Sequence, residues 1–157
     1  MDKYTVLKDN KEKSGWFFYP DKDCAGMKDV HLKTADYTIE GLEELLCIER
    51  KKTVAELSQN ITELRFAKEI ERMMKFKYRY IICEFDMYKI TVFPKESGLP
   101  EHIIKKLKIP PGYIKLKISE YERAGIKVIL AGNKYQGFLF AKKIFKEVYD
   151  AERRTTE

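Results

Sequence analysis

Three short apolar runs constrain the fold of this chain more than any other feature. They are LLCI within residues 42–51, RYIICEF at 79–85 and KVILA at 127–131. Each run is too short for a buried helix and meets charged or turn residues, as buried strands do. Apolar residues also recur at three- and four-residue steps over 61–74 and 134–150, which is the period of an amphipathic helix. Strands that alternate with helices predict an α/β domain with a mixed central β-sheet flanked by helices.

Local signals predict the remaining elements. Thr53-Val54-Ala55-Glu56 fits the S/T-x-x-E capping box, so a helix should begin at Thr53. Pro100 fits the first position of a helix that reaches Lys108, and Pro110-Pro111-Gly112 should stop it. We further expect a strand at 3–8, a loop at 9–29 with an aromatic strand at 16–19, a short strand within 30–38 that ends at Asp36-Tyr37, a loop at 94–100 and a frayed tail at 150–157.

Length and charge limit the class of protein. The 157 residues suit a single domain over residues 1–157. The net charge of +6 favours a polyanionic partner, while a basic surface also serves solubility. The three cysteines are widely spaced, which argues against a disulfide framework, and Cys47 and Cys83 lie in apolar runs typical of a core. With no secretory signal and no apolar run of membrane length, we expect a soluble intracellular protein.

The candidate site lies where the first of the three buried runs becomes charged. In a strand, alternate residues share a face, so Glu49 and Lys51 should point to one side and Arg50 to the other. Asp36 closes the preceding strand candidate. Hydrolysis of a phosphodiester at neutral pH uses a metal that binds phosphoryl oxygens and acidifies water, and magnesium prefers carboxylate oxygens. Asp36, Glu49 and Lys51 are therefore candidate catalytic residues; the alternative is a solvated strand end.

The context of these residues carries a family resemblance. Asp36-Tyr37, then Ile48-Glu49-Arg50-Lys51 before a helix opening, resembles the G-D…E-R-K signature of XPF-type structure-specific endonucleases, whose nuclease domain has a restriction-endonuclease-like fold. Weaker likenesses cover the rest of the chain except 87–118. They are the first-strand acids Asp9 and Glu12, Arg65-Phe66 followed by Glu69, the strand that ends at Glu84, and ERAGIKVILAGN before the last helix.

The chain departs from the family pattern at three positions. Ala35 replaces the glycine before the aspartate, and Lys11 replaces the arginine of the first-strand motif. The last motif carboxylate falls one position late, at Glu56. A glutamate in the first turn of a helix binds free backbone amides, so we expect a structural role for Glu56.

The resemblance implies roles for individual residues. Asp36 and Glu49 would ligate Mg²⁺ or Mn²⁺, with the Arg50 carbonyl as a third ligand, and Lys51 would assist the attacking water or the phosphate. Asp9, Glu12 and Glu56 would support the site. Residues expected to contact DNA are Arg50, Lys52 and Arg65. The alternative for Arg50 and Arg65 is to buttress the carboxylates, and for Arg65 a salt bridge on the helix surface is an equal expectation.

The same resemblance implies an endonuclease that cuts branched DNA such as flaps, forks or junctions, in repair or recombination. Family nuclease domains commonly pair, so a homodimer is expected, with its interface around residues 138–149. Two alternatives stay open: a non-catalytic DNA-binding scaffold that keeps the fold, and a restriction-like enzyme that cuts ordinary duplex DNA.

Two further stretches have competing interpretations. Trp16-Phe17-Phe18-Tyr19 has the composition of a surface that stacks on unpaired bases, but such clusters more often close the edge of a core, and we expect the core role. The lysines of residues 102–117 either follow a DNA backbone or form a solvated face.

Overall fold

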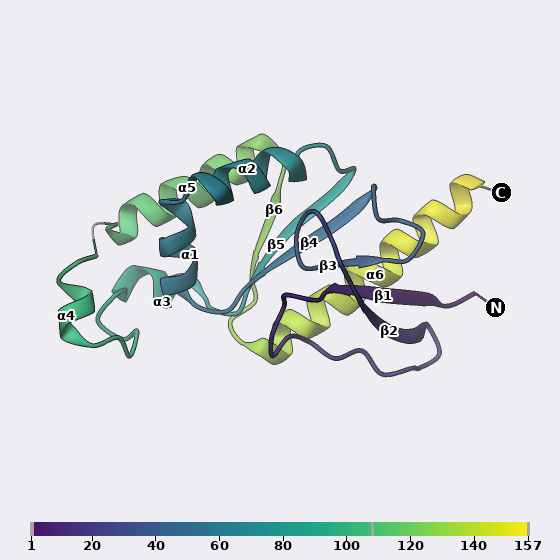
Figure 1. The fold of residues 1–157 in the computed structure, drawn as a ribbon, viewed down its shortest axis with the longest axis horizontal. Helices are drawn as coiled ribbons and strands as arrows, with labels where there is room; N and C mark the ends of the chain where they lie inside the picture. The colour runs from purple at the N-terminus through teal and green to yellow at the C-terminus, as the bar shows by residue number, and fades with distance from the viewer. Residues whose placement is uncertain (1, 108, 157) are drawn as a thin grey trace.

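The computed structural model describes residues 2–107 and 109–156, which form one six-stranded sheet with helices on both faces (Figure 1). The strands are β1 Tyr4–Asp9, β2 Cys24–Val30, β3 Tyr37–Ile39, β4 Leu46–Lys51, β5 Tyr78–Cys83 and β6 Lys127–Leu130. The helices are α1 Val54–Ile61, α2 Leu64–Met73, α3 Met87–Val92, α4 Glu101–Ile104, α5 Pro111–Ala124 and α6 Lys134–Thr156.

The strand order is β2-β1-β3-β4-β5-β6. β3 pairs antiparallel with both β1 and β4, whereas the β1–β2, β4–β5 and β5–β6 pairs are parallel. This confirms the predicted mixed sheet. Only β3 runs against the other strands, so its first residue meets the carboxyl ends of β1 and β4 at one edge of the sheet. That edge brings the end of the Asp36 segment beside residues 49–51.

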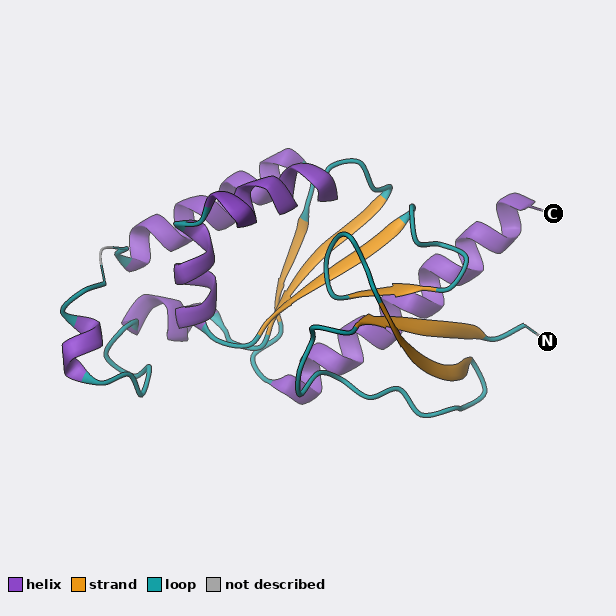
Figure 2. Ribbon diagram, in the orientation of Figure 1, coloured by secondary structure: helices purple, strands orange, loops and turns teal. Residues whose placement is uncertain are grey.

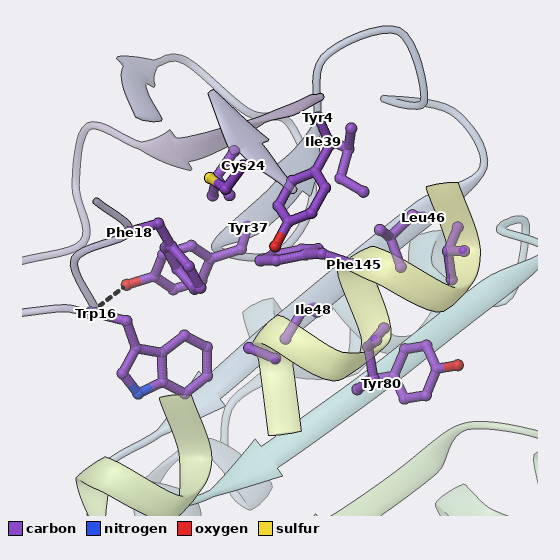
Figure 3. Close-up of a cluster of buried hydrophobic side chains, with 14 of the residues drawn as sticks. Tyr4, Trp16, Phe18, Cys24, Tyr37, Ile39, Leu46, Ile48, Tyr80 and Phe145 are labelled. Atoms are coloured by element: carbon purple, nitrogen blue, oxygen red, sulfur yellow. Dashed lines mark hydrogen bonds between the residues drawn. The ribbon is translucent and has the colours of Figure 1, made fainter. Parts of the chain in front are cut away.

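Helices cover both faces of the sheet (Figure 2). An apolar cluster lies on each face, and the side chains of β4 contribute alternately to the two clusters. Leu46 and Ile48 pack with Phe145 and Val148 of α6, and Figure 3 shows this cluster. On the other face, Cys47 packs with side chains of α1, α2, α3 and α5. Cys47 and Cys83 are buried and free, as expected for core cysteines. No helix in the described part of the chain is long and apolar enough to cross a membrane.

Most of the helices and strands predicted from the apolar pattern are confirmed, and so is the capping box at Thr53. Thr53 is the N-cap of α1, and its hydroxyl accepts a hydrogen bond from the Glu56 amide at 3.1 Å. In return, the Glu56 carboxylate accepts one from the Lys52 amide at 3.2 Å. Glu56 therefore fixes the turn between β4 and α1, which is the structural role expected for it.

Five expectations were wrong. Residues 16–19 form no strand, and the expected loop at 9–29 instead contains most of β2. The expected strand within 30–38 falls mostly between β2 and β3. β2 is an edge strand with an irregular pairing and an exposed face, so it lacks the apolar run that identifies central strands.

The other two errors concern prolines and the C-terminus. Pro111 begins α5 rather than stopping a helix, because its fixed φ suits the first helical turn. The short helix expected from Pro100 is α4, with Pro100 as its N-cap, and Lys108 lies outside the described residues. α6 continues to Thr156 instead of fraying from residue 150. Glu152 holds it by accepting hydrogen bonds from Lys77 and Tyr78 at 2.8 and 2.7 Å.

Candidate active site

Strand β4 carries the centre of the site. Glu49 and Lys51 share the face covered by α1 and α2, and their side chains are 2.7 Å apart. Arg50 points to the opposite face, where it contacts Glu84. All three residues are buried, with relative exposures of 5%, 4% and 5%. The period-two pattern therefore predicts the directions of these side chains correctly, but these residues are not a solvated strand end.

The turn before β3 places Asp36 against this strand. The Asp36 amide donates to the Ile48 carbonyl at 3.0 Å, and its own carbonyl accepts from the Asp9 amide at 2.8 Å. Its carboxylate accepts a hydrogen bond from the Arg50 amide at 2.8 Å. Three backbone groups therefore hold Asp36 beside Glu49.

Ala35 stands where the family pattern has glycine, and its φ of 64° lies in the left-handed region that glycine adopts more easily. The Ala35 amide donates to the Glu69 carboxylate at 2.8 Å. Glu69 of α2 therefore stabilises the turn that presents Asp36. Only the family likeness drew attention to Glu69, and it assigned no role.

The Asp36 and Glu49 carboxyl groups are electrostatic neighbours; Glu49 is buried and Asp36 is half-buried. Burial raises the pKa of Glu49 to about 7, against the lowering effect of Lys51 and with a further increase from Glu69. Burial, then the charges of Glu49 and Glu12, raise the pKa of Asp36 well above its usual range. Two neighbouring carboxyl groups with little exposure to water are costly to ionise together unless a cation joins them.

Lys51 is held in one position by three neighbours. Its Nζ is 2.7 Å from Glu49 and 2.5 Å from Asn60 Oδ1, and it lies 4.6 Å from the centre of the Phe66 ring. The Asn60 amide in turn donates to Glu63 at 2.9 Å. Asn60 is a site residue that the sequence did not indicate. It lies in α1, outside strand β4, and belongs to no motif.

The Arg50 side chain is held by acidic residues on the opposite face of β4. Its guanidinium makes two hydrogen bonds to Glu84, at 2.8 and 2.9 Å, and lies 3.4 Å from Glu12. Trp16 also donates to Glu84 at 2.8 Å. The Arg50 side chain is only 2% exposed, which favours the supporting role, and a contact of this side chain with DNA stays a prediction. The proposed metal ligand is its backbone carbonyl, which this burial does not affect.

Of the expected supporting acids, Glu12 and Glu56 lie near the centre of the site. Asp9 instead binds backbone amides of two neighbouring loops. Glu12 raises the pKa of Asp36, and Glu56 acts electrostatically on both Glu12 and Lys51. Asp9 accepts hydrogen bonds from the Leu32 and Lys11 amides, at 2.9 and 3.3 Å. These bonds hold the loops after β1 and β2, and so give Asp9 a structural role.

The two expected DNA contacts outside the strand are on the surface. Lys52 is exposed directly after β4. Arg65 is 82% exposed in its side chain and lies 3.5 Å from Glu63 on the same helical surface. Arg65 therefore does not support the carboxylates.

Comparison with known proteins adds evidence about the fold. No family model and no curated protein matches the sequence. The structure is similar to XPF from Aeropyrum pernix, with a TM-score of 0.65 and 13% identity over 92% of this chain and 65% of that one. It is also similar to XPF from Aeropyrum pernix in complex with DNA, with a TM-score of 0.63 and 12% identity over 95% of this chain and 66% of that one.

The chain thus spans about two thirds of the length of these XPF structures. At such low identity the likeness concerns the fold. The resemblance expected from the E-R-K context is confirmed at that level.

Proposed function

We propose that this protein is a metal-dependent DNA endonuclease that hydrolyses phosphodiester bonds, with Asp36, Glu49 and Lys51 at its centre. The observation that supports this most is that backbone groups hold the Asp36 carboxylate against β4, next to Glu49 and the fixed lysine Lys51. A purely structural site gains nothing from two adjacent acids whose ionisation is opposed. A site for a divalent cation needs them.

The residues fit a divalent metal. Glu12 Oε2 is buried and has no hydrogen-bond partner among residues 2–107 and 109–156, and the Asp36 and Glu49 carboxyl groups are electrostatic neighbours. No group of three His, Cys, Asp or Glu side chains within residues 2–107 and 109–156 forms a complete metal cage. Mg²⁺ and Mn²⁺ do not require one, since they bind through one or two carboxylates with water and substrate phosphate. Asp36 and Glu49 would hold the ion, with the Arg50 carbonyl beside them. When bound, it would polarise the phosphate and acidify water.

Lys51 acts as a cation and not as a base. Burial lowers its pKa, but the Glu49 charge and hydrogen bond outweigh that effect, so the net shift is upward. A protonated lysine held by Glu49 and Asn60 can donate to a phosphate oxygen or orient a water. Asn60 and Glu69 keep Lys51 and Asp36 in place, and the Arg50–Glu84 pair fixes β4 from the other face.

DNA as the substrate is supported by the net charge of +6 and by the likeness to an XPF structure solved with DNA. The proposal extends to branched DNA in repair or recombination, as the family resemblance implies. A homodimer is part of the proposal, with a surface narrower than the expected range of residues 138–149. Ala141, Phe145 and Val148 are buried against the sheet, which leaves Leu139 and Phe140 exposed on α6.

One assay tests this function. Labelled fork, flap, four-way junction and blunt duplex DNA are incubated with the protein in Mg²⁺, Mn²⁺ or EDTA. We expect cleavage of the branched substrates that either ion supports and EDTA abolishes. Binding without cleavage under every condition would favour the scaffold, and equal cleavage of plain duplex would favour a restriction-like enzyme.

The carboxyl pair also predicts a pH-dependent stability in the absence of metal. In the folded protein, Glu49 and Asp36 stay protonated at pH values above the pKa that these groups have in the unfolded chain. Their contribution is therefore fully present below the unfolded pKa and is lost as pH rises through the folded value of about 7 for Glu49. We expect the melting temperature in EDTA to fall by a few degrees between pH 5 and pH 8.

Mg²⁺ should restore this loss at pH 8 and have little effect at pH 5, where protons compete with it. Differential scanning fluorimetry at both pH values measures the change. Asp36→Asn removes one acid and should flatten the dependence. A melting temperature in EDTA that rises towards pH 8 would contradict the assignment of this pair.

A further inference from the structure

The segment Trp16-Phe17-Phe18-Tyr19 has two faces, although it forms no strand. Trp16 and Phe18 are buried, with exposures of 3% and 2%, whereas Phe17 and Tyr19 are 57% and 73% exposed. The expected core role of this cluster is thus confirmed for two of its four aromatic side chains. The other two need a different explanation.

The buried half holds the segment rigidly. The Trp16 amide donates to the Tyr37 hydroxyl at 2.8 Å, as Figure 3 shows, and the Phe18 ring packs 5.3 Å from that of Phe145. A side chain at Gly15 would collide with the same hydroxyl, so the chain passes tightly over Tyr37. Phe17 and Tyr19 are therefore presented on a fixed backbone and not on a mobile loop tip.

The exposed half forms a small aromatic surface. The Phe17 and Tyr19 rings contact each other, with centroids 4.5 Å apart and planes inclined at 55°. Phe17 also forms part of the wall of a groove of about 700 Å³, whose other sides come from β1, β2 and Gly15. Large aromatic side chains that stay exposed beside a groove commonly mark a binding surface.

The charges around this surface favour an anionic partner. Lys11, Lys13 and Lys22 are exposed in the same connection, and none of them joins the ion pairs formed among residues 2–107 and 109–156. The acids of this connection are already paired: Asp21 with Lys142 at 2.7 Å, Asp23 with Lys146 at 3.5 Å, and Glu12 with Arg50.

The surface is coupled to the candidate active site through Trp16. The Trp16 indole donates to Glu84, which holds Arg50, and the Arg50 guanidinium lies 5.7 Å from the centre of the Trp16 ring. Glu12, four residues earlier in the chain, also contacts Arg50. A strand lying on Phe17 and Tyr19 would continue along residues 11–16 towards the carboxyl end of β4.

We propose that Phe17 and Tyr19 form a stacking platform for the bases of an unpaired DNA strand that leads into the candidate active site. Aromatic rings with adjacent lysines bind single strands because every base offers a flat face and every linkage a negative charge. A duplex hides those faces, so the platform would distinguish a flap or fork arm from ordinary duplex. This proposal rests on the proposed function and specifies how that site would select branched DNA.

The test compares Phe17→Ala/Tyr19→Ala with Tyr88→Ala/Tyr113→Ala, which removes two exposed tyrosines from α3 and α5. Fluorescence anisotropy in EDTA measures affinity for a labelled oligo-dT 20-mer and for a blunt duplex. We expect the first variant to lose about tenfold or more of its affinity for oligo-dT and less than about twofold for duplex. The control variant and the ring-preserving Phe17→Tyr/Tyr19→Phe should bind as the unaltered protein does.

Photocrosslinking supplies a readout that does not depend on affinity. Oligo-dT that carries 5-iodouracil should crosslink to Phe17 or Tyr19 in the unaltered protein. Equal binding of oligo-dT by the platform and control variants, or crosslinks only elsewhere, would overturn the platform even if forked DNA is cleaved. Crosslinks at these two residues in a protein that cuts no DNA would leave the platform standing and overturn the proposed hydrolysis.

Discussion

Glu49→Gln should lower the rate of Mg²⁺-dependent cleavage of forked DNA by roughly 10³-fold or more, and Asp36→Asn should do the same. An amide keeps the shape of the carboxylate but supplies no charge to a hard dication. Both side chains are fixed by β4 and by the turn before β3, so no neighbouring acid can take their place without backbone movement. Single-turnover cleavage at saturating protein measures this loss directly.

The two variants should remain folded, and this separates a lost ligand from a lost fold. Replacing Asp36 relieves repulsion, so the melting temperature of Asp36→Asn in EDTA at pH 8 should equal or exceed that of the unaltered protein. Glu49→Gln also removes the ion-pair partner of the buried Lys51, so its melting temperature should be somewhat lower while the protein stays folded. The stabilisation by Mg²⁺ should disappear. Glu44→Gln, an exposed acid just before β4, is the matched control and should change neither property. Cleavage within tenfold of the unaltered rate in either site variant would exclude these residues as the metal ligands.

How much of the site was predictable depends on whether its parts are local in sequence. The directions of Glu49, Arg50 and Lys51 follow from strand periodicity alone, because they need only one correctly identified strand. The contact between Asp36 and Glu49 needs the β3–β4 pairing as well, and the family likeness supplied it. Asn60 and Glu69 come from helices that pack against the site, and no spacing along the chain indicates such contacts.

The strands of the fold likewise differ in how clearly the local sequence predicts them. β4, β5 and β6 are central or helix-covered strands, so burial leaves an apolar run in each of them. β2 is an edge strand whose outward residues are polar, and the sequence signal is correspondingly weak. The Trp16–Tyr19 segment alternates like a strand but has no neighbour to pair with. Its two buried side chains are held by α6 and Tyr37 instead.

Arg50→Ala should destabilise the protein by about 3–5 kcal/mol, the largest stability effect expected from a substitution at the site. Its guanidinium holds Glu84 and Glu12, whose side chains are only 6% and 11% exposed. Without Arg50 these acids keep their burial and lose their counter-charge. Urea unfolding measures the loss. Arg65→Ala removes an arginine that is 82% exposed and should cost no more than about 0.5 kcal/mol. A similar small cost for Arg50→Ala would contradict the supporting role.

The double variant Arg50→Met/Glu84→Gln distinguishes the net value of this ion pair from the cost of breaking it. Removing Glu84 together with Arg50 leaves one acid without a counter-charge, Glu12, instead of two, so part of the stability lost in Arg50→Ala should return. Cleavage should not return to the same extent, because Glu12 would lack its cationic neighbour while remaining close to Asp36. Recovery of stability without recovery of cleavage would mean that the pair is there to order the charges around the metal ligands. Recovery of both stability and cleavage would mean that the Arg50–Glu84 pair only stabilises the core and that uncharged side chains can replace it.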